Sequence, residues 1–168
     1  MTKLKRGFTL IELLVVISII GILATLLVAN YNAARSRARD AQRKSDVRNI
    51  QTALRLYYND TQRYPCDDGV TINPNEVSDI KGCGTQAACA SVTSCNWGSL
   101  WAADSSRTYM STLPDDPSPD RSYKFDQTDN DNYTLKACLE NTSDDKCSLT
   151  TEAWCNTTLG GCVYVVQP

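Results

Sequence analysis

Residues 8–29 form a 22-residue apolar run whose only charged side chain is Glu12. A helix of that length rises about 33 Å at 1.5 Å per residue, enough to cross a bilayer core of about 30 Å. A secretory signal peptide has a shorter apolar region that ends in a small-x-small cleavage site, and residues 29–32 offer no good match to one. The run therefore predicts a helix that stays in the mature chain and is covered by lipid or by other copies.

The helix is expected to continue through an amphipathic half, residues 30–64, because no proline or glycine interrupts residues 30–60. Apolar residues recur there with helical spacing, at Val47, Ile50, Leu54 and Tyr57, flanked by Ala53 and Tyr58. A helix over residues 8–59 would be about 75 Å long. That length exceeds one small domain, so its first half needs partners.

Charge divides the chain into two parts. Residues 1–64 carry a net +7 and residues 65–168 a net −9, which together give the chain's −2. The sequence has no histidine, the commonest general base and a frequent metal ligand. It also has no nucleophile motif and no glycine-rich phosphate loop. We therefore expect a basic stem joined to an acidic head (residues 65–168), and a structural protein in place of an enzyme.

The first part of the head is expected to be rich in loops. Residues 66–121 are rich in Gly, Asp, Asn, Ser and Cys, with few apolar runs. One short helix is expected within residues 96–111. Its packing residues would be Trp97, Leu100, Trp101 and Met110.

The end of the head is expected to form a small sheet. Alternating apolar and polar residues predict a strand at 133–140, which follows a strand at 121–125 and a polar turn at 126–132. A third strand is expected at 162–166. An antiparallel sheet resting on the apolar stripe of residues 47–58 would bury both surfaces, which is an α+β fold.

All eight cysteines lie in the head, at Cys66, Cys83, Cys89, Cys95, Cys138, Cys147, Cys155 and Cys162. An even count without a C-x-x-C pair favours disulfides over a zinc site and indicates an oxidising compartment. Cys66 with Cys83 and Cys89 with Cys95 would close the shortest loops. The head is therefore expected outside the cytoplasm.

The other four cysteines can be paired from the expected sheet. Antiparallel pairing of the last two strands would place Cys138 nearly opposite Cys162, which favours a bridge between them. Cys147 and Cys155 would then close the intervening loop. The alternative is sequential pairing, Cys138 with Cys147 and Cys155 with Cys162.

The N-terminus carries a processing signal. A short basic leader ends at Gly7, Phe8 follows, and Glu12 lies four residues further inside the apolar run. This pattern closely resembles the class III signal sequence of type IV pilins and of the pseudopilins of type II secretion. The resemblance implies that a membrane-embedded prepilin peptidase removes residues 1–7 by cutting between Gly7 and Phe8 and methylates the new amine of Phe8.

Glu12 has a physical role in this interpretation. A carboxylate within a membrane-spanning helix is costly and calls for a partner. The cationic amine of Phe8 on the next copy would supply one, and a wrong axial register would leave a shielded charge unpaired. The alternative is that Glu12 extends to the lipid headgroups.

Other features follow or depart from the family pattern. Gly21 is similar to the helix-weakening glycine of this family, but the proline that often follows eight residues later is Ala29 here. Tyr64-Pro65 and residues 113–117, Leu-Pro-Asp-Asp-Pro, look like landmarks of major pseudopilins. Ser118 stands where a tryptophan often follows.

Major pseudopilins also bind calcium in a C-terminal loop. The only weak candidates are Asp126, Asp129 and Asp131, which lack the glycine and the bidentate glutamate of an EF-hand. A polar hairpin turn is the simpler interpretation. No cofactor is expected.

A basic cluster follows the apolar run, at Arg35, Arg37, Arg39, Arg43, Lys44 and Arg48. Because the leader is basic too, the positive-inside rule does not decide the orientation. The cluster could contact lipid headgroups, acidic heads of neighbouring copies, or DNA. Interleaving with Asp40 and Asp46 disfavours DNA.

The resemblance implies a pilin, a subunit that forms a helical homopolymer for adhesion, motility or DNA uptake. Its implied partners are the prepilin peptidase, an assembly platform and the inner membrane, which the precursor spans once with the head outside. One alternative is a type II secretion pseudopilin in a short periplasmic fibre. Another is a monomeric membrane-anchored binding module, which would need neither Glu12 nor Gly7.

Overall fold

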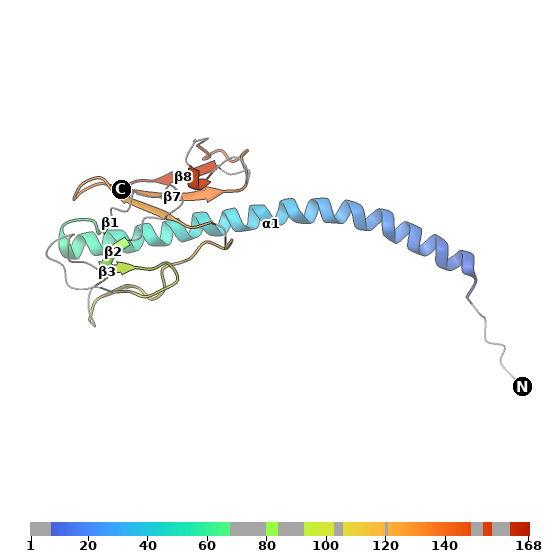
Figure 1. Cartoon of the computed structure of the whole chain (residues 1–168), viewed down its shortest axis with the longest axis horizontal. Coiled ribbons are helices and arrows are strands. Elements are labelled where there is room, and N and C mark those ends of the chain that lie inside the picture. The colour runs from blue at the N-terminus through green and yellow to red at the C-terminus, as the bar shows by residue number, and fades with distance from the viewer. Residues whose placement is uncertain are drawn as a thin grey trace, which may run out of the picture. The chain divides into compact units, whose positions relative to one another are not determined.

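The computed structural model describes residues 8–67, 80–83, 93–102, 106–119, 121–148, 153–155 and 162–168. The chain forms two compact units, Met1–Ser36 and Arg37–Pro168. Each unit is described by itself. Helix α1, Leu10–Thr61, contributes its first half to one unit and its second half to the other (Figure 1).

Helix α1 has 52 residues and confirms the predicted helix. At 1.5 Å per residue it is about 78 Å long. Its end follows from the local sequence. Gln62 adopts a left-handed φ of 57° and donates its N–H to the Tyr58 carbonyl at 2.7 Å, and Pro65 then restricts Tyr64 to an extended conformation.

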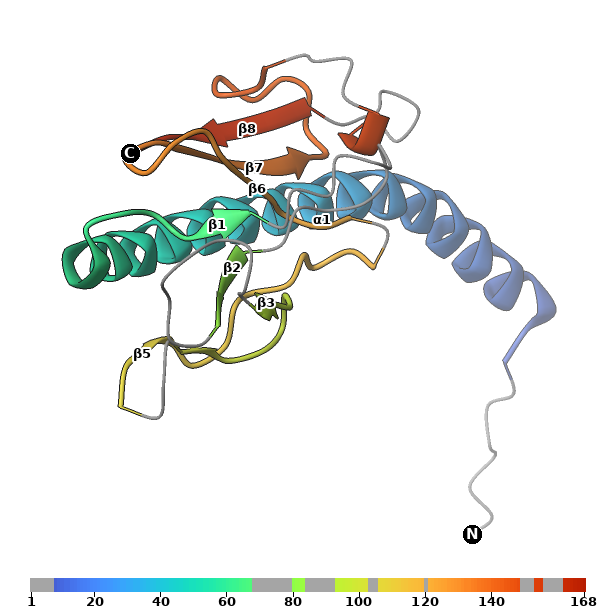
Figure 2. The same ribbon diagram turned by 60° about the vertical axis from the view of Figure 1, so that its left-hand side comes forward.

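The core of the second unit lies along one stripe of α1. Val47, Ile50, Leu54 and Tyr57 are fully buried, as the spacing predicted, and Ala53 is 4% exposed. These positions recur every three or four residues and therefore share one face. The sheet of β6, β7 and β8 lies on one side of this helix, and strands β2 and β3 lie on the other (Figures 1 and 2).

The C-terminal sheet confirms the predicted antiparallel arrangement. Its strands are β6 (Lys124–Gln127), β7 (Tyr133–Leu139) and β8 (Cys162–Val166), in the order β6-β7-β8. Phe125 and Val166 both lie opposite Leu135. The predicted first strand, 121–125, is displaced by a few residues because the hairpin closes around residues 128–132.

Short strands form the other side of the head. β1 (Cys66–Asp67), β2 (Ile80–Cys83) and β3 (Thr93–Cys95) make one antiparallel sheet. β4 (Trp101–Ala102) and β5 (Thr108–Met110) make a two-stranded pair.

The predicted helix within 96–111 is wrong. Gly98 has a φ of 81°, which is incompatible with a right-handed helix, and Trp101 pairs with Met110 across two strands. Trp101 is fully buried with its ring centroid 5.8 Å from that of Tyr57 and 5.4 Å from that of Tyr109. Packing of this one large ring against α1 therefore decides the local structure.

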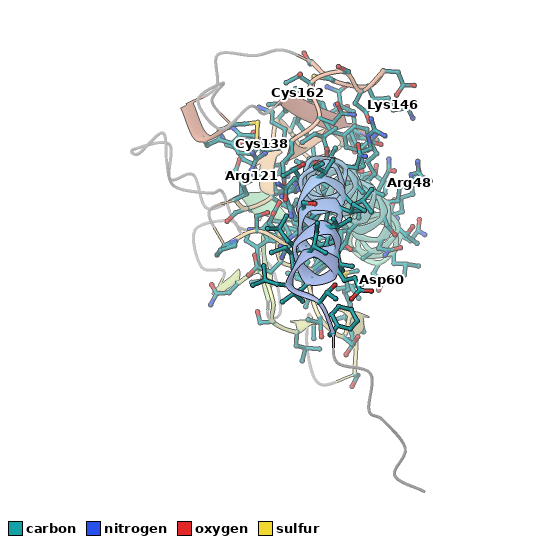
Figure 3. The ribbon with its side chains drawn as sticks, turned by 90° about the vertical axis from the view of Figure 1, so that its right-hand side faces the viewer. Arg48, Asp60, Arg121, Cys138, Lys146 and Cys162 are labelled. Atoms are coloured by element: carbon teal, nitrogen blue, oxygen red, sulfur yellow. A yellow bond between two sulfur atoms is a disulfide. The ribbon has the colours of Figure 1, made fainter. Side chains whose placement is uncertain are left out.

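The disulfides differ from both predicted patterns. Cys138 is bonded to Cys155, and Cys147 to Cys162 (Figure 3). In the β7–β8 register Cys162 lies opposite Leu139, one position beyond Cys138. Because opposed residues share a face and successive residues alternate, Cys138 and Cys162 point to opposite faces of the sheet. The predicted Cys138–Cys162 and Cys147–Cys155 bridges are therefore wrong, as is sequential pairing.

Cys66 and Cys95 each also take part in a disulfide. Cys89 and the side chain of Cys83 lie outside the described residues. The pairs Cys66–Cys83 and Cys89–Cys95 stay predictions.

Candidate functional site

The N-terminus of α1 is closed by a capping box. Thr9 precedes the helix, and its N–H donates to Glu12 Oε2 at 2.9 Å. The Thr9 hydroxyl also donates to Oε2, and the Glu12 N–H approaches that hydroxyl oxygen at 3.4 Å. Thr9 and Glu12 thus each accept a backbone N–H of the other, which the first helical turn leaves unpaired. The Thr-x-x-Glu spacing was a sequence signal for this role that our sequence analysis missed.

The first half of α1 exposes its apolar side chains. Phe8 is 77% exposed, Leu10 81% and Ile11 69%, and the large apolar residues through Leu23 are also exposed. By length and composition, α1 is able to cross a membrane. A surface this apolar marks a contact with lipid or protein.

The predicted processing and assembly residues are partly brought together. Phe8 and Glu12 line one open pocket of about 370 Å³ with Ile11, Val15 and Val16. A Cβ at Gly21 would meet no atom within 4 Å, so packing within the chain does not require glycine there. Gly7 lies outside the described residues.

Arg43 occupies the centre of a buried ion cluster in the second unit. Its side chain is fully buried and binds Asp116 through two parallel contacts, Nε to Oδ2 and Nη2 to Oδ1, both 2.8 Å. Its Nη1 donates to Asp40 Oδ1 at 2.8 Å and to Glu140 Oε1 at 2.9 Å, and Nη2 also donates to Ser118 Oγ at 2.8 Å. Each carboxylate that Arg43 contacts accepts a hydrogen bond from it. A buried guanidinium is stable only when its charge is paired in this way.

The cluster joins three separate segments of the chain. Asp40 accepts the backbone N–H groups of Glu140 at 2.9 Å and Asn141 at 2.8 Å, where β7 ends. Arg39 binds Glu140 through both of its oxygens. α1 therefore holds both the end of β7 and the loop that contains Asp116.

Hydrogen bonds within the cluster shift the pKa values of Glu140 and Arg43. Hydrogen bonds from Arg39, and secondarily from Arg43, lower the pKa of Glu140 to about 2. Burial alone would lower the pKa of Arg43, but its hydrogen bonds to Asp116 and Glu140 raise it. Glu140 and Arg43 are therefore both ionised at neutral pH.

The pseudopilin-like landmark supplies part of this cluster. Leu113 is fully buried, and Asp116 is the carboxylate that Arg43 binds. The sequence analysis placed Arg43 in the basic cluster but missed its burial within the chain, although a signal was present. Position 43 extends the stripe of Val47 and Ile50 backwards by four residues, so its guanidinium had to be buried on the head-facing side.

The basic cluster divides between two faces of α1. Arg39 and Arg43 bind carboxylates of the same chain, and Lys44 Nζ lies 2.5 Å from Asp144 Oδ2. Arg37 and Arg48 are exposed.

The weak calcium candidates are engaged elsewhere. Asp126 lies 3.3 Å from Lys136 Nζ, and Asp131 accepts the Tyr58 hydroxyl at 2.7 Å. Asp129 accepts two hydrogen bonds from Asn132. Within the described ranges no group of three or more His, Cys, Asp or Glu residues is placed to hold a metal ion.

Comparison with known proteins gives matches over the N-terminal part of the chain. Residues 2–28 match the model of the prokaryotic N-terminal methylation motif. The chain is 43% identical over 61 residues to the type II secretion system core protein G of Pectobacterium carotovorum, covering 36% of this chain and 39% of that protein. It is 37% identical over 60 residues to the type IV major pilin protein PilA of Myxococcus xanthus, covering 36% and 27%.

A third relative is the type IV wide pilus major component PilA4 of Thermus thermophilus, 40% identical over 68 residues, or 40% of this chain and 52% of that protein. The matches thus span 27–52% of these three relatives. No solved structure matches.

The fold and the N-terminal match first define a class: an α+β head carried on a long helix with a methylation motif at its start. More specifically, over 36–40% of its length the chain is similar to type II secretion system core protein G and to type IV pilins.

Proposed function

We propose that this chain is the structural subunit of a type IV pilus-like filament, which polymerises through the first half of α1. The observation that carries the proposal is the exposure of that half, where Phe8, Leu10 and Ile11 are 69–81% exposed. Lipid would cover these side chains in the precursor, and neighbouring copies would cover them in the filament. The relatives named as pilins and as secretion core proteins are consistent with a structural role.

Processing would precede assembly. The prepilin peptidase would cut between Gly7 and Phe8 and methylate Phe8, with the precursor spanning the inner membrane once and its head outside. Both hydrogen bonds within the capping box that reach the Glu12 carboxylate end on Oε2. Oε1 would then accept the cationic amine of Phe8 from the next copy, which sets the axial register.

Glu12→Ala is expected to leave membrane insertion and cleavage intact while strongly reducing filament yield, because the partner of the amine is lost. Electron microscopy of the sheared surface fraction, with mass spectrometry of the N-terminus, measures assembly and processing separately. Glu12→Gln is the matched variant that separates the charge from the cap. It keeps the size of the side chain and the capping hydrogen bonds but removes the charge. Normal yield from both variants would show that Glu12 does not set the register.

A pseudopilin is the second candidate, favoured by the identity to secretion core protein G. That match covers 36% of this chain, the same share as the match to the pilin of Myxococcus xanthus, so it does not separate the two. We favour the pilus because an exposed fibre benefits from disulfides, each of which contributes roughly 2–4 kcal/mol. A deletion strain that keeps its surface fibres but loses protein secretion would favour the pseudopilin instead.

A further inference from the structure

The exposed side of α1 in the second unit carries a row of positive charge. Arg37, Arg48 and Arg55 are all exposed, and their spacings of eleven and seven residues place them along one line of the helix. Figure 3 shows Arg48 on the outer side of α1. Among the described residues none of the three takes part in an ion pair.

No acidic side chain interrupts this row. Asp40 and Asp46, which the sequence interleaves with the arginines, both face the head. Asp40 binds Arg43, and Asp46 accepts the Tyr123 hydroxyl at 2.8 Å. The exposed face is thus more basic than the sequence order indicates.

A complementary surface lies in the β6–β7 turn of the same chain, residues 128–132. Asp129 and Asp131 are exposed there. The Asp129 carboxylate accepts the Asp131 N–H at 2.8 Å, and Asp131 accepts the Tyr58 hydroxyl at 2.7 Å. Tyr64 N–H binds the Asn130 carbonyl at 2.8 Å. The two carboxylates are thereby held in place without a cation from the described part of the chain.

We propose that, in the filament, the acidic 128–132 turn of one copy docks on the arginine row of a second copy. This inference rests on the proposed polymerisation. Arg48 and Arg55 are about 10.5 Å apart along the helix, and two carboxylates two residues apart reach across at most about 7 Å. With the length of the arginine side chains added, one turn can contact two arginines at once.

A second copy suits this row better than another polyanion. The head carries a net −9, so polymerisation brings acidic surfaces to the row at high local concentration. The rigid turn adds little ordering cost on docking. DNA and anionic lipid are the competing occupants.

Charge reversal and exchange test this contact. Arg48→Glu, and separately Asp129→Lys with Asp131→Lys, are each expected to lower sheared filament yield roughly fivefold, and combining all three changes should restore it. Lys146→Glu, an exposed reversal away from the row, is the matched control and should assemble normally. Non-reducing peptide mapping checks that each variant keeps the Cys138–Cys155 bridge.

A cross-link identifies the partner directly. In mixed isotope-labelled filaments of Arg48→Lys, carbodiimide is expected to join position 48 of one copy to Asp129 or Asp131 of another. Failure of the exchange to restore assembly, or cross-links only to other carboxylates, would overturn the proposal. So would normal assembly of Arg48→Glu combined with loss of binding to a short DNA duplex or to phosphatidylglycerol vesicles. Absence of filaments from the unaltered chain would instead refute the proposed function itself.

Discussion

Replacing Arg43 by methionine tests whether the ion cluster fastens the head to α1. Methionine is similar in length but supplies none of the five contacts that Arg43 makes to Asp116, Asp40, Glu140 and Ser118. The loss falls mainly on Asp116, whose side chain is fully buried. Asp116 keeps one backbone donor, the Ser118 N–H at 2.8 Å, whereas Asp40 keeps two backbone N–H donors and Glu140 keeps the cationic Arg39.

Removing one partner of a buried ion pair costs about 3–5 kcal/mol. That amount is a large share of the roughly 5–15 kcal/mol that separates a folded domain from its unfolded state. We expect Arg43→Met to lower the free energy of unfolding by about 3 kcal/mol, the lower end of the range, because each of the three carboxylates keeps another hydrogen-bond donor.

Urea unfolding of the full chain in detergent measures this, with tryptophan fluorescence as the probe because the Trp101 indole is buried beside Tyr57. Arg48→Met, an exposed change on the same helix, should alter stability by less than about 0.5 kcal/mol. The double variant Arg43→Met with Asp116→Leu should be more stable than Arg43→Met alone, since it removes the unpaired carboxylate. A loss below about 1 kcal/mol for Arg43→Met, or a double variant that is less stable still, would refute this account.

The remaining predictions concern acid, disulfides and processing. Because the folded-state pKa of Glu140 is about 2 against an ordinary 4.5, its stabilising contribution is present above pH 4.5 and is lost as pH falls towards 2; a urea series in that window should show a weaker pH dependence for Glu140→Gln. Peptide mapping without reduction should yield a fragment joining Cys138 to Cys155, and one joining Cys138 to Cys162 would contradict the sheet register. Gly7→Val should leave an uncleaved precursor in the membrane fraction, and efficient cleavage of it would refute the assigned processing site.

Local patterns made α1 and the C-terminal sheet predictable. The stripe from Val47 to Tyr57 repeats with helical spacing, and the alternation from Tyr133 to Leu139 repeats with strand spacing. Each pattern is contained in consecutive residues, so no distant contact was needed to read it. The Thr9–Glu12 cap was equally local and could have been found.

Features that depend on distant partners were not predictable in the same way. Trp101 pairs with Met110 in a strand and packs beside Tyr57, which lies 44 residues earlier in the chain. The disulfides depended on a register in which an offset of one residue reverses the face of every side chain. Spacing could assign Cys138 and Cys162 to paired strands, but it could not supply that single-residue offset.

The ion cluster explains why a landmark motif was recognisable while its purpose was not. Leu113 and Asp116 serve two surfaces at once, since the leucine enters the apolar core and the carboxylate binds Arg43. The sequence of the loop shows only a resemblance to a family landmark. The partner of Asp116 is Arg43, 73 residues away. It lies on a helix whose charged side chains all look solvated in the sequence, which does not show which of them face the head. Since Asp40 and Asp46 turn towards the head with Arg43, the same burial that fastens the loop leaves Arg37, Arg48 and Arg55 without an ion pair among the described residues. Fastening the head to α1 and presenting a basic row to a second copy are therefore two consequences of one helical pattern.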